Sequence, residues 1–204
     1  MNGGQAGPAG ERIVVSALGD SITAGNPGWD PDPVRRLDEG DDPQSQYLYW
    51  AARADPRIEF RNHGVGGECT DEILRRFEAA AGGADVLVVQ GGINDVVHER
   101  SLEAAAANLQ ELVRRGKERG LRVALVNVLP WNRGWPDADP RIRRLNELIA
   151  ALGDEEQVPV MPFYETLEDP DRPGRMREDW TADGNHPSVA GHRRLGEVAF
   201  ILPA

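Results

Sequence analysis

Short apolar stretches recur along the chain, and each is followed by glycine, proline or a polar residue. They occupy residues 13–18, 85–89, 123–128 and 158–163, with 57–62 as a shorter candidate. Runs of four to eight largely apolar residues are typical of strands that are buried on both faces. We therefore predict five strands, the last of them weakened by Pro159 and Pro162.

Between these stretches the apolar residues fall at helical spacing. The longest such segment is 102–119, where Leu102, Leu109 and Leu112 lie on one helical face. The other predicted helices cover residues 47–54, 70–80, 142–152 and 189–201. Strands that alternate with helices indicate an α/β fold, in which a parallel sheet is covered by helices on both faces. With 204 residues, we expect one domain over 11–204 after a glycine-rich tail at 1–10.

Composition narrows the classes of partner. A formal net charge of −11 argues against nucleic acid and against anionic lipid, since both bind basic surfaces. No apolar run approaches the ~20 residues that a membrane span needs, and the N-terminus lacks the pattern of a secretory signal. Cys69 is the only cysteine, so no internal disulfide is possible. We expect a cytoplasmic protein with a small-molecule substrate; a form processed after secretion is the alternative, and the oligomeric state stays open.

Polar residues that carry chemistry follow the predicted strands. Ser21 comes after the first, Gly67 after the second and Asn94 after the third, while Asp183 and His186 precede the last helix. In open parallel sheets, ligands bind outside the carboxyl ends of the strands. These residues are therefore expected to meet at one edge of the sheet.

Together these residue types are what acyl transfer requires. A serine hydroxyl needs a base, an imidazole can act as that base, and a carboxylate can orient the imidazole. We predict Ser21 as the nucleophile, His186 as the base and Asp183 as its partner. The backbone N–H groups of Ser21 and Gly67 and the side-chain amide of Asn94 are the candidate donors of an oxyanion hole.

The four blocks, in this order, resemble those of the SGNH (GDSL-type) hydrolases, although the first block reads Gly-Asp-Ser-Ile-Thr where the family name has leucine. The resemblance covers residues 19–186. It implies a three-layer α/β/α fold with a flavodoxin-like five-stranded sheet, and an esterase that needs no cofactor. Because such hydrolases act on esters of many kinds, the resemblance does not specify the substrate.

Two features bear on the substrate. Four tryptophans fall in loops near the predicted site and are candidate substrate-binding residues: Trp29, Trp131, Trp135 and Trp180. The loop over 26–46 is strongly acidic, and no loop carries the extended aliphatic run that would line a deep acyl tunnel. We therefore hypothesise a small neutral ester with a short acyl group.

Other chemistries lack their motifs. The chain has no Gly-x-Ser-x-Gly elbow, no phosphate-binding Gly-x-x-x-x-Gly-Lys loop, no dinucleotide fingerprint and no His-Glu-x-x-His. Its four histidines are scattered, so we expect no catalytic metal. Two alternatives remain, an acyltransferase that uses the same residues and a non-catalytic carbohydrate-binding module.

Overall fold

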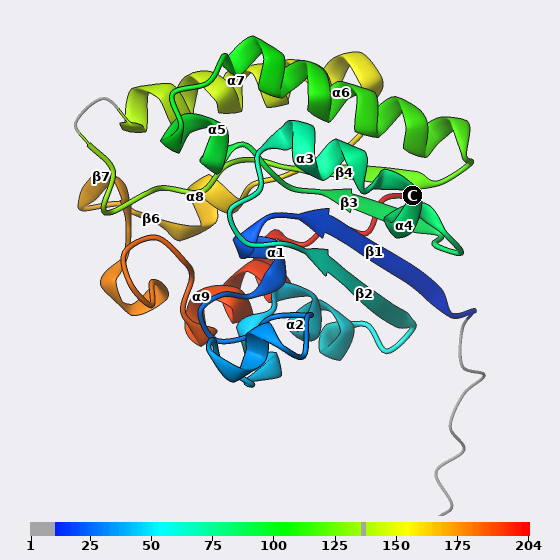
Figure 1. The fold of residues 1–204 in the computed structure, drawn as a ribbon, viewed down its shortest axis with the longest axis horizontal. Coiled ribbons are helices and arrows are strands. Elements are labelled where there is room, and N and C mark those ends of the chain that lie inside the picture. The colour runs from blue at the N-terminus through cyan, green and yellow to red at the C-terminus, as the bar shows by residue number, and fades with distance from the viewer. Residues whose placement is uncertain (1–10, 136–137) are drawn as a thin grey trace, which may run out of the picture.

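A parallel sheet of five strands runs through the middle of the molecule (Figure 1) in the computed structural model, which describes residues 11–135 and 138–204. The strand order is β2-β1-β3-β4-β5, and every neighbouring pair is parallel. This is the flavodoxin-like order, so the predicted α/β fold is confirmed. The strands are β1 (Ile13–Gly19), β2 (Ile58–Gly64), β3 (Val86–Val89), β4 (Arg122–Val126) and β5 (Val160–Met161).

Helices cover both faces of the sheet (Figure 1). Side chains of one strand alternate between the faces, so Leu87 and Val89 join one hydrophobic core while Val86 and Val88 join the other. The first core lies under α3 (Thr70–Arg75), α4 (Phe77–Ala81), α6 (Leu102–Glu118) and α7 (Ala138–Glu156). The second lies under α2 (Tyr47–Ala54), α8 (Phe163–Leu167), α9 (Val189–Arg194) and the π-helical turn η4 (Leu195–Ala199).

Several short elements line the carboxyl ends of the strands. The helices α1 (Ser21–Ala24) and α5 (Ile93–Val97) directly follow β1 and the β3 segment. The long predicted loops contain the 3₁₀ turns η1 (Arg35–Leu37), η2 (Pro43–Ser45) and η3 (Glu178–Trp180) and the hairpin of β6 (Glu168–Asp169) and β7 (Arg172–Met176). Elements this short show no periodicity that a sequence pattern can reveal.

Several predicted elements differ in extent from the structure; the helix expected over 142–152, for example, runs over Ala138–Glu156. The helix expected over 70–80 is divided at Arg76, whose backbone leaves the helical region so that its side chain can reach the ends of β1 and β2. The strand expected over 158–163 pairs only at Val160 and Met161, because Pro159 and Pro162 flank it. The helix expected over 189–201 ends at Ala199, and Phe200 is extended.

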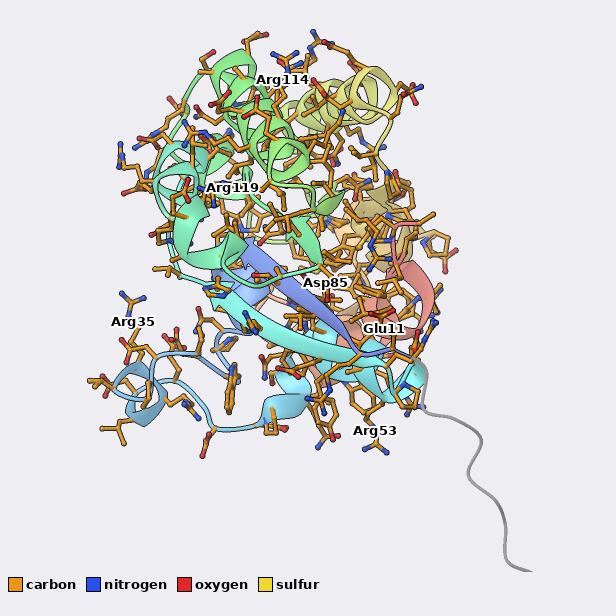
Figure 2. The ribbon with its side chains drawn as sticks, turned by 90° about the vertical axis from the view of Figure 1, so that its right-hand side faces the viewer. Glu11, Arg35, Arg53, Asp85, Arg114 and Arg119 are labelled. Carbon is orange, nitrogen blue, oxygen red and sulfur yellow. The ribbon has the colours of Figure 1, made fainter. Side chains whose placement is uncertain are left out.

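The two ends of the sheet differ in what they present. Glu11 and Asp85, which precede β1 and β3, lie at the amino ends of the strands, whereas Arg35 stands at the outer edge of the opposite side (Figure 2).

Over residues 11–135 and 138–204, no helix combines the length and apolar character that crossing a bilayer requires.

Candidate active site

Ser21 lies at the carboxyl end of β1, as the first residue of α1. The carboxylate of Asp20 caps this short helix by accepting the backbone N–H of Ile22 at 2.9 Å. This cap fixes the turn between strand and helix. The Ser21 hydroxyl therefore projects from the end of the sheet rather than into either core.

His186 and Asp183 lie against Ser21, although 165 residues separate the serine from the histidine in sequence. The Nε2 atom of His186 is 3.1 Å from the Ser21 Oγ atom, and its Nδ1 atom is 2.8 Å from the Asp183 Oδ2 atom. Both contacts are within hydrogen-bond reach. The three side chains therefore form the connected chain of hydroxyl, imidazole and carboxylate that the sequence suggests.

Asp183 is held by its own turn. Its Oδ1 atom accepts the backbone N–H groups of Asn185 and His186, each at 2.8 Å. Burial alone would raise the pKa of Asp183, but the hydrogen bonds from the His186 ring and from these two backbone groups outweigh it and lower the pKa. The carboxylate is thus charged at neutral pH and suited to keeping the proton of His186 on Nδ1.

Thr181 closes the same turn. Its Oγ1 atom accepts the N–H of Gly184 at 2.8 Å and donates to the carbonyl of His186 at 2.9 Å. Gly184 has a φ of +86°, a left-handed conformation that favours glycine. Hydrogen bonds within this one turn therefore orient the Asp183–His186 pair.

Gly67 and Asn94 lie on the other side of Ser21. Gly67 has a φ of +81°, and a Cβ atom built on it would meet nothing within 4 Å, so its backbone borders open space. The Nδ2 atom of Asn94 donates one hydrogen to the carbonyl of Glu68 at 2.9 Å. Its second hydrogen has no acceptor among the described residues, and Asn94 lines the cavity beside Ser21.

Arg76 joins three segments around this site, a role that the sequence did not reveal. Its guanidinium donates to the carbonyl of Gly19 at 3.0 Å and to that of His63 at 2.7 Å, at the ends of β1 and β2. It also forms an ion pair with Glu68. An arginine inside a predicted helix carries no signal of such a role; only the tertiary structure shows it.

Asp95 fixes the start of α5 against α3. Its carboxylate accepts the backbone N–H of Thr70 at 3.0 Å and the Thr70 hydroxyl at 2.9 Å. Burial raises the pKa of Asp95 despite these bonds. Burial also raises the pKa of the neighbouring Cys69 thiol to about 11, so this cysteine stays protonated and is a poor nucleophile at neutral pH.

A second buried network lies beneath the nucleophile. The Oδ2 atom of Asp20 accepts the side-chain amide of Gln90 at 3.0 Å, and the Gln90 Oε1 atom accepts the Thr23 hydroxyl at 2.8 Å and the backbone N–H of Asp20 at 3.2 Å. Burial raises the pKa of Asp20 to about 6, against the lowering effect of the hydrogen bonds from Ile22 and Gln90. This network ties the turn after β1 to the end of β3.

Two cavities meet at Ser21, and both are also lined by Asn94 and His186. The larger cavity has a volume of about 630 Å³, and its further lining includes Asn26, Pro27, Asp30, Arg35, Glu39, Gly66, Gly67 and Asp183. The smaller cavity has a volume of about 200 Å³, and its further lining consists of Ile22, Ile93, Val97, Trp131 and Asn185. The hydroxyl is thus accessible from a polar side and from a mainly apolar side.

The four candidate tryptophans occupy different surroundings. Trp131 lines the smaller cavity, and Trp135 packs edge-on against it with ring centroids 5.2 Å apart. Trp29 is covered by the guanidinium of Arg36 at 4.2 Å. Trp180 lies between two arginine side chains and packs against the second core. Only Trp131 is among the residues that line the two cavities at Ser21.

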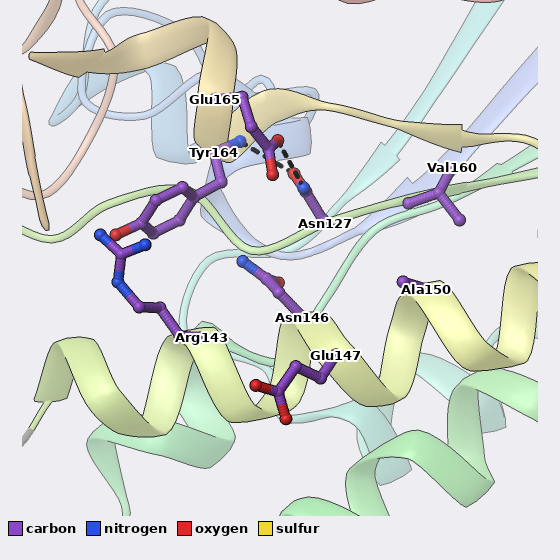
Figure 3. A pocket seen from close by; sticks show the side chains of 8 residues that line it. All are labelled: Asn127, Arg143, Asn146, Glu147, Ala150, Val160, Tyr164 and Glu165. Carbon is purple, nitrogen blue, oxygen red and sulfur yellow. Dashed lines mark hydrogen bonds between the residues drawn. The ribbon is translucent and has the colours of Figure 1, made fainter. Parts of the chain in front are cut away.

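A further pocket of about 360 Å³ lies between α7 and α8, beside the edge strand β5 (Figure 3). Its polar side chains are engaged with one another, with the backbone or with side chains outside the pocket. Asn127 donates to Glu165 at 2.8 Å, and Asn146 donates to and accepts from the backbone of Val128. It shares no lining residue with the cavities at Ser21. Nothing in this pocket supplies a nucleophile with a base.

Metal ligands are not grouped in the part of the chain that the structure describes. No three histidine, cysteine, aspartate or glutamate side chains there are arranged to hold a metal ion.

Comparisons with known proteins bear on the family and the fold of the chain. A model of the GDSL-like lipase/acylhydrolase family matches residues 17–194. No curated protein sequence matches the chain.

Solved structures share the fold at low sequence identity. A member of the lipolytic protein G-D-S-L family from Veillonella parvula superimposes with a TM-score of 0.72 at 21% identity, covering 90% of this chain and 94% of its own. An acetyl xylan esterase superimposes with a TM-score of 0.72 at 19% identity over 91% and 96% of the two chains. An acetyl-xylooligosaccharide esterase from Geobacillus Stearmophilus superimposes with a TM-score of 0.71 at 20% identity, covering 92% of this chain and 92% of its own.

Proposed function

The chain belongs to the GDSL-like lipase/acylhydrolase family, and from this we propose that it is a serine esterase that works through an acyl-enzyme on Ser21. The observation that carries the proposal is the continuous chain of contacts from Ser21 through His186 to Asp183. A hydroxyl, an imidazole and a carboxylate in this arrangement are suited to acyl transfer.

In the proposed reaction, the Ser21 Oγ atom attacks the ester carbonyl carbon while its proton passes to the Nε2 atom of His186. The carbonyl oxygen becomes an oxyanion, which the backbone N–H groups of Ser21 and Gly67 and the free amide hydrogen of Asn94 stabilise. The carbon–oxygen bond to the alcohol then breaks, and His186 returns its proton to the departing alcohol. Asp183 stabilises the imidazolium between these two transfers.

Water completes the cycle. It attacks the acyl carbon and gives one proton to His186, the bond between Ser21 and the acyl group breaks, and the proton returns to the serine. The carboxylic acid leaves. Because the site opens to a cavity of about 630 Å³, water reaches the acyl group without a conformational change. Transfer to another alcohol would use the same residues, and a competing alcohol in the assay would reveal it as a new ester among the products.

For the substrate class we propose small neutral esters with short acyl groups. The larger cavity carries Asp30, Glu39 and Asp183 against the single cation Arg35. A negative lining disfavours anionic substrates. Two of the structurally similar proteins are esterases of acetylated xylan or xylooligosaccharides by their titles, and short acetyl esters of neutral sugars fit this description.

The test is covalent labelling and turnover in Ser21→Ala. We expect a fluorophosphonate to label the wild-type chain at Ser21, and Ser21→Ala to escape labelling and to lose nearly all hydrolysis of an acetyl ester. Ser101→Ala is the matched control, because Ser101 caps the amino end of α6 and lines neither cavity. Ester hydrolysis by Ser21→Ala at the wild-type rate would refute the proposal.

A further inference from the structure

The two cavities that meet at Ser21 differ in chemistry as well as in size. Apart from the reacting groups and Asn185, the smaller cavity presents aliphatic and aromatic surface from Ile22, Ile93, Val97 and Trp131. The larger cavity presents charged side chains, among them Arg35 and Glu39. An ester has two sides, and both must be accommodated when its carbonyl carbon lies at the Ser21 hydroxyl.

We propose that the smaller cavity binds the acyl chain and the larger cavity binds the alcohol, and that Trp131 and Val97 limit the length of the acyl chain. This assignment rests on the proposed esterase function. A methylene group gains affinity when apolar surface surrounds it, about fourfold for each group fully buried. In the larger cavity the same chain would displace water from charged groups without replacing its hydrogen bonds.

The volume sets the length that fits. The smaller cavity, of about 200 Å³, has roughly a third of the volume of the larger one, of about 630 Å³. Short acyl groups therefore fit inside it, and a long chain has to leave it past its walls.

One wall is fixed by hydrogen bonding. The indole Nε1 atom of Trp131 donates to the Asn185 Oδ1 atom at 2.7 Å, and Trp135 supports the ring from behind. Asn185 belongs to the turn that carries His186, and its own N–H is bound to Asp183. Trp131 is thus attached to the catalytic turn, so the indole cannot swing away without disturbing that turn.

The opposite wall belongs to α5. Ile93 and Val97 are four residues apart, so they lie on the same face of this helix and next to Asn94. Ile93 is buried, whereas Val97 is half-buried. Val97 packs against the first core only with a partly buried side chain, whereas Ile93 belongs to that core. A larger side chain at Val97 therefore narrows the cavity at a smaller cost in packing, and this makes position 97 the better one to change.

The experiment measures kcat/KM for 4-nitrophenyl acetate, butyrate, hexanoate and octanoate. In the wild type we expect activity to be retained up to hexanoate and to fall at least tenfold at octanoate. Val97→Phe should lower the hexanoate-to-acetate ratio at least tenfold, and Val97→Ala and Trp131→Leu should each raise the octanoate-to-acetate ratio several-fold. Val34→Ala, at an exposed valine of the 26–46 loop, is the matched control and should keep the wild-type profile.

A second series varies the alcohol at constant acetyl: methyl, phenyl and 2-naphthyl acetate. The Val97 and Trp131 variants should preserve the wild-type ranking of these three. If they alter the ranking of the alcohols and leave that of the acyl chains unchanged, the assignment of the cavities is wrong. If the fluorophosphonate labels Ser21 but Val97→Phe changes neither the acyl nor the alcohol preference, this inference alone is wrong. If the wild-type chain is not labelled and hydrolyses no ester, the proposed function itself is wrong.

Discussion

Asn94 uses its two amide hydrogens in different ways. One is bound to the carbonyl of Glu68, which fixes the direction of the side chain, and the other is free to meet a developing oxyanion. A donor that is already oriented needs no rearrangement during the reaction, which is why such donors are effective. The position of this amide depends in turn on Asp95 and Thr70, which attach the start of α5 to α3.

From this geometry we expect Asn94→Ala to lower kcat by about 10²–10³ and to change KM much less, because the interaction matures in the transition state. Steady-state kinetics on 4-nitrophenyl acetate measure both constants. Gln110→Ala is the control, since it removes a carboxamide of α6 that bonds to Glu155 and Glu156 and lines neither cavity at Ser21. An increase in KM at unchanged kcat would instead assign Asn94 to substrate binding.

At the scale of elements, the connection between β1 and β3 depends on a carboxylate facing a carboxamide. Asp20 accepts from Gln90, and Gln90 accepts from Thr23 and from the backbone of Asp20. All of these groups are buried, so each donor that loses its acceptor carries the full cost of its desolvation.

Asp20→Asn should therefore reduce the free energy of unfolding by about 1–3 kcal/mol, because it sets two amide donors against each other. Turnover should fall as well, since the turn before Ser21 loses its support. The double variant Asp20→Asn with Gln90→Glu exchanges carboxylate and carboxamide, and it should recover most of the lost stability and turnover. Urea unfolding and ester kinetics on the wild type, Asp20→Asn and the double variant measure both effects. A double variant with no higher free energy of unfolding and no faster turnover than Asp20→Asn would contradict the proposed pairing.

The elements also show how far the sequence alone can be followed. Long apolar runs identify four strands, because a strand buried on both faces has almost no polar residues, and β5 is short for the reason that its prolines suggest. The β6–β7 hairpin gives no such signal, since Glu168, Asp169 and Arg172 are polar and use ion pairs rather than a core.

For the site, the named residues Ser21, Asp183 and His186 lie in contact, and their catalytic roles stay predictions. The sequence does not reveal the role of Arg76, because its three bonds join segments far apart in sequence. It also does not reveal that Ser21 lies between a polar and an apolar cavity. Val97 and Arg35, which line these cavities, come close to Ser21 only in the folded chain.

For the whole molecule, the response to acid depends on a histidine outside the site. His192 on α9 is fully buried, and neither of its ring nitrogens has a hydrogen-bond partner among the described residues. Burial lowers its pKa from 6.5 to about 3. Between these values the unfolded chain binds a proton that the folded chain does not, so the contribution of His192 to stability is intact above about pH 6.5 and is lost as the pH falls toward 3.

The free energy of unfolding should fall between pH 7 and pH 4 in both chains. We expect the fall to be about 3 kcal/mol smaller in His192→Leu than in the wild type, because the variant lacks this titrating group. Comparison with the wild type is needed because Asp20, with its raised pKa, acts in the opposite direction below pH 6. Urea unfolding at pH 7, 5.5 and 4 gives the values, and His98→Gln, at an exposed histidine, is the control. Equal dependence on pH in both chains would exclude His192 as the cause.

The strand order has a consequence for how the chain folds while it is being synthesised. Once β1 and β2 have been synthesised, β3 pairs with the free edge of β1, and β4 and β5 each pair with the strand made just before, so the sheet can grow in the order of synthesis. Ser21, the proposed nucleophile, is made at the beginning, and His186, its proposed base, follows 165 residues later, on the order of 10–30 s at ordinary rates of translation. If the proposed function is right, a nascent chain carries a serine that no imidazole has yet reached, and it acquires activity only when the turn of His186 docks.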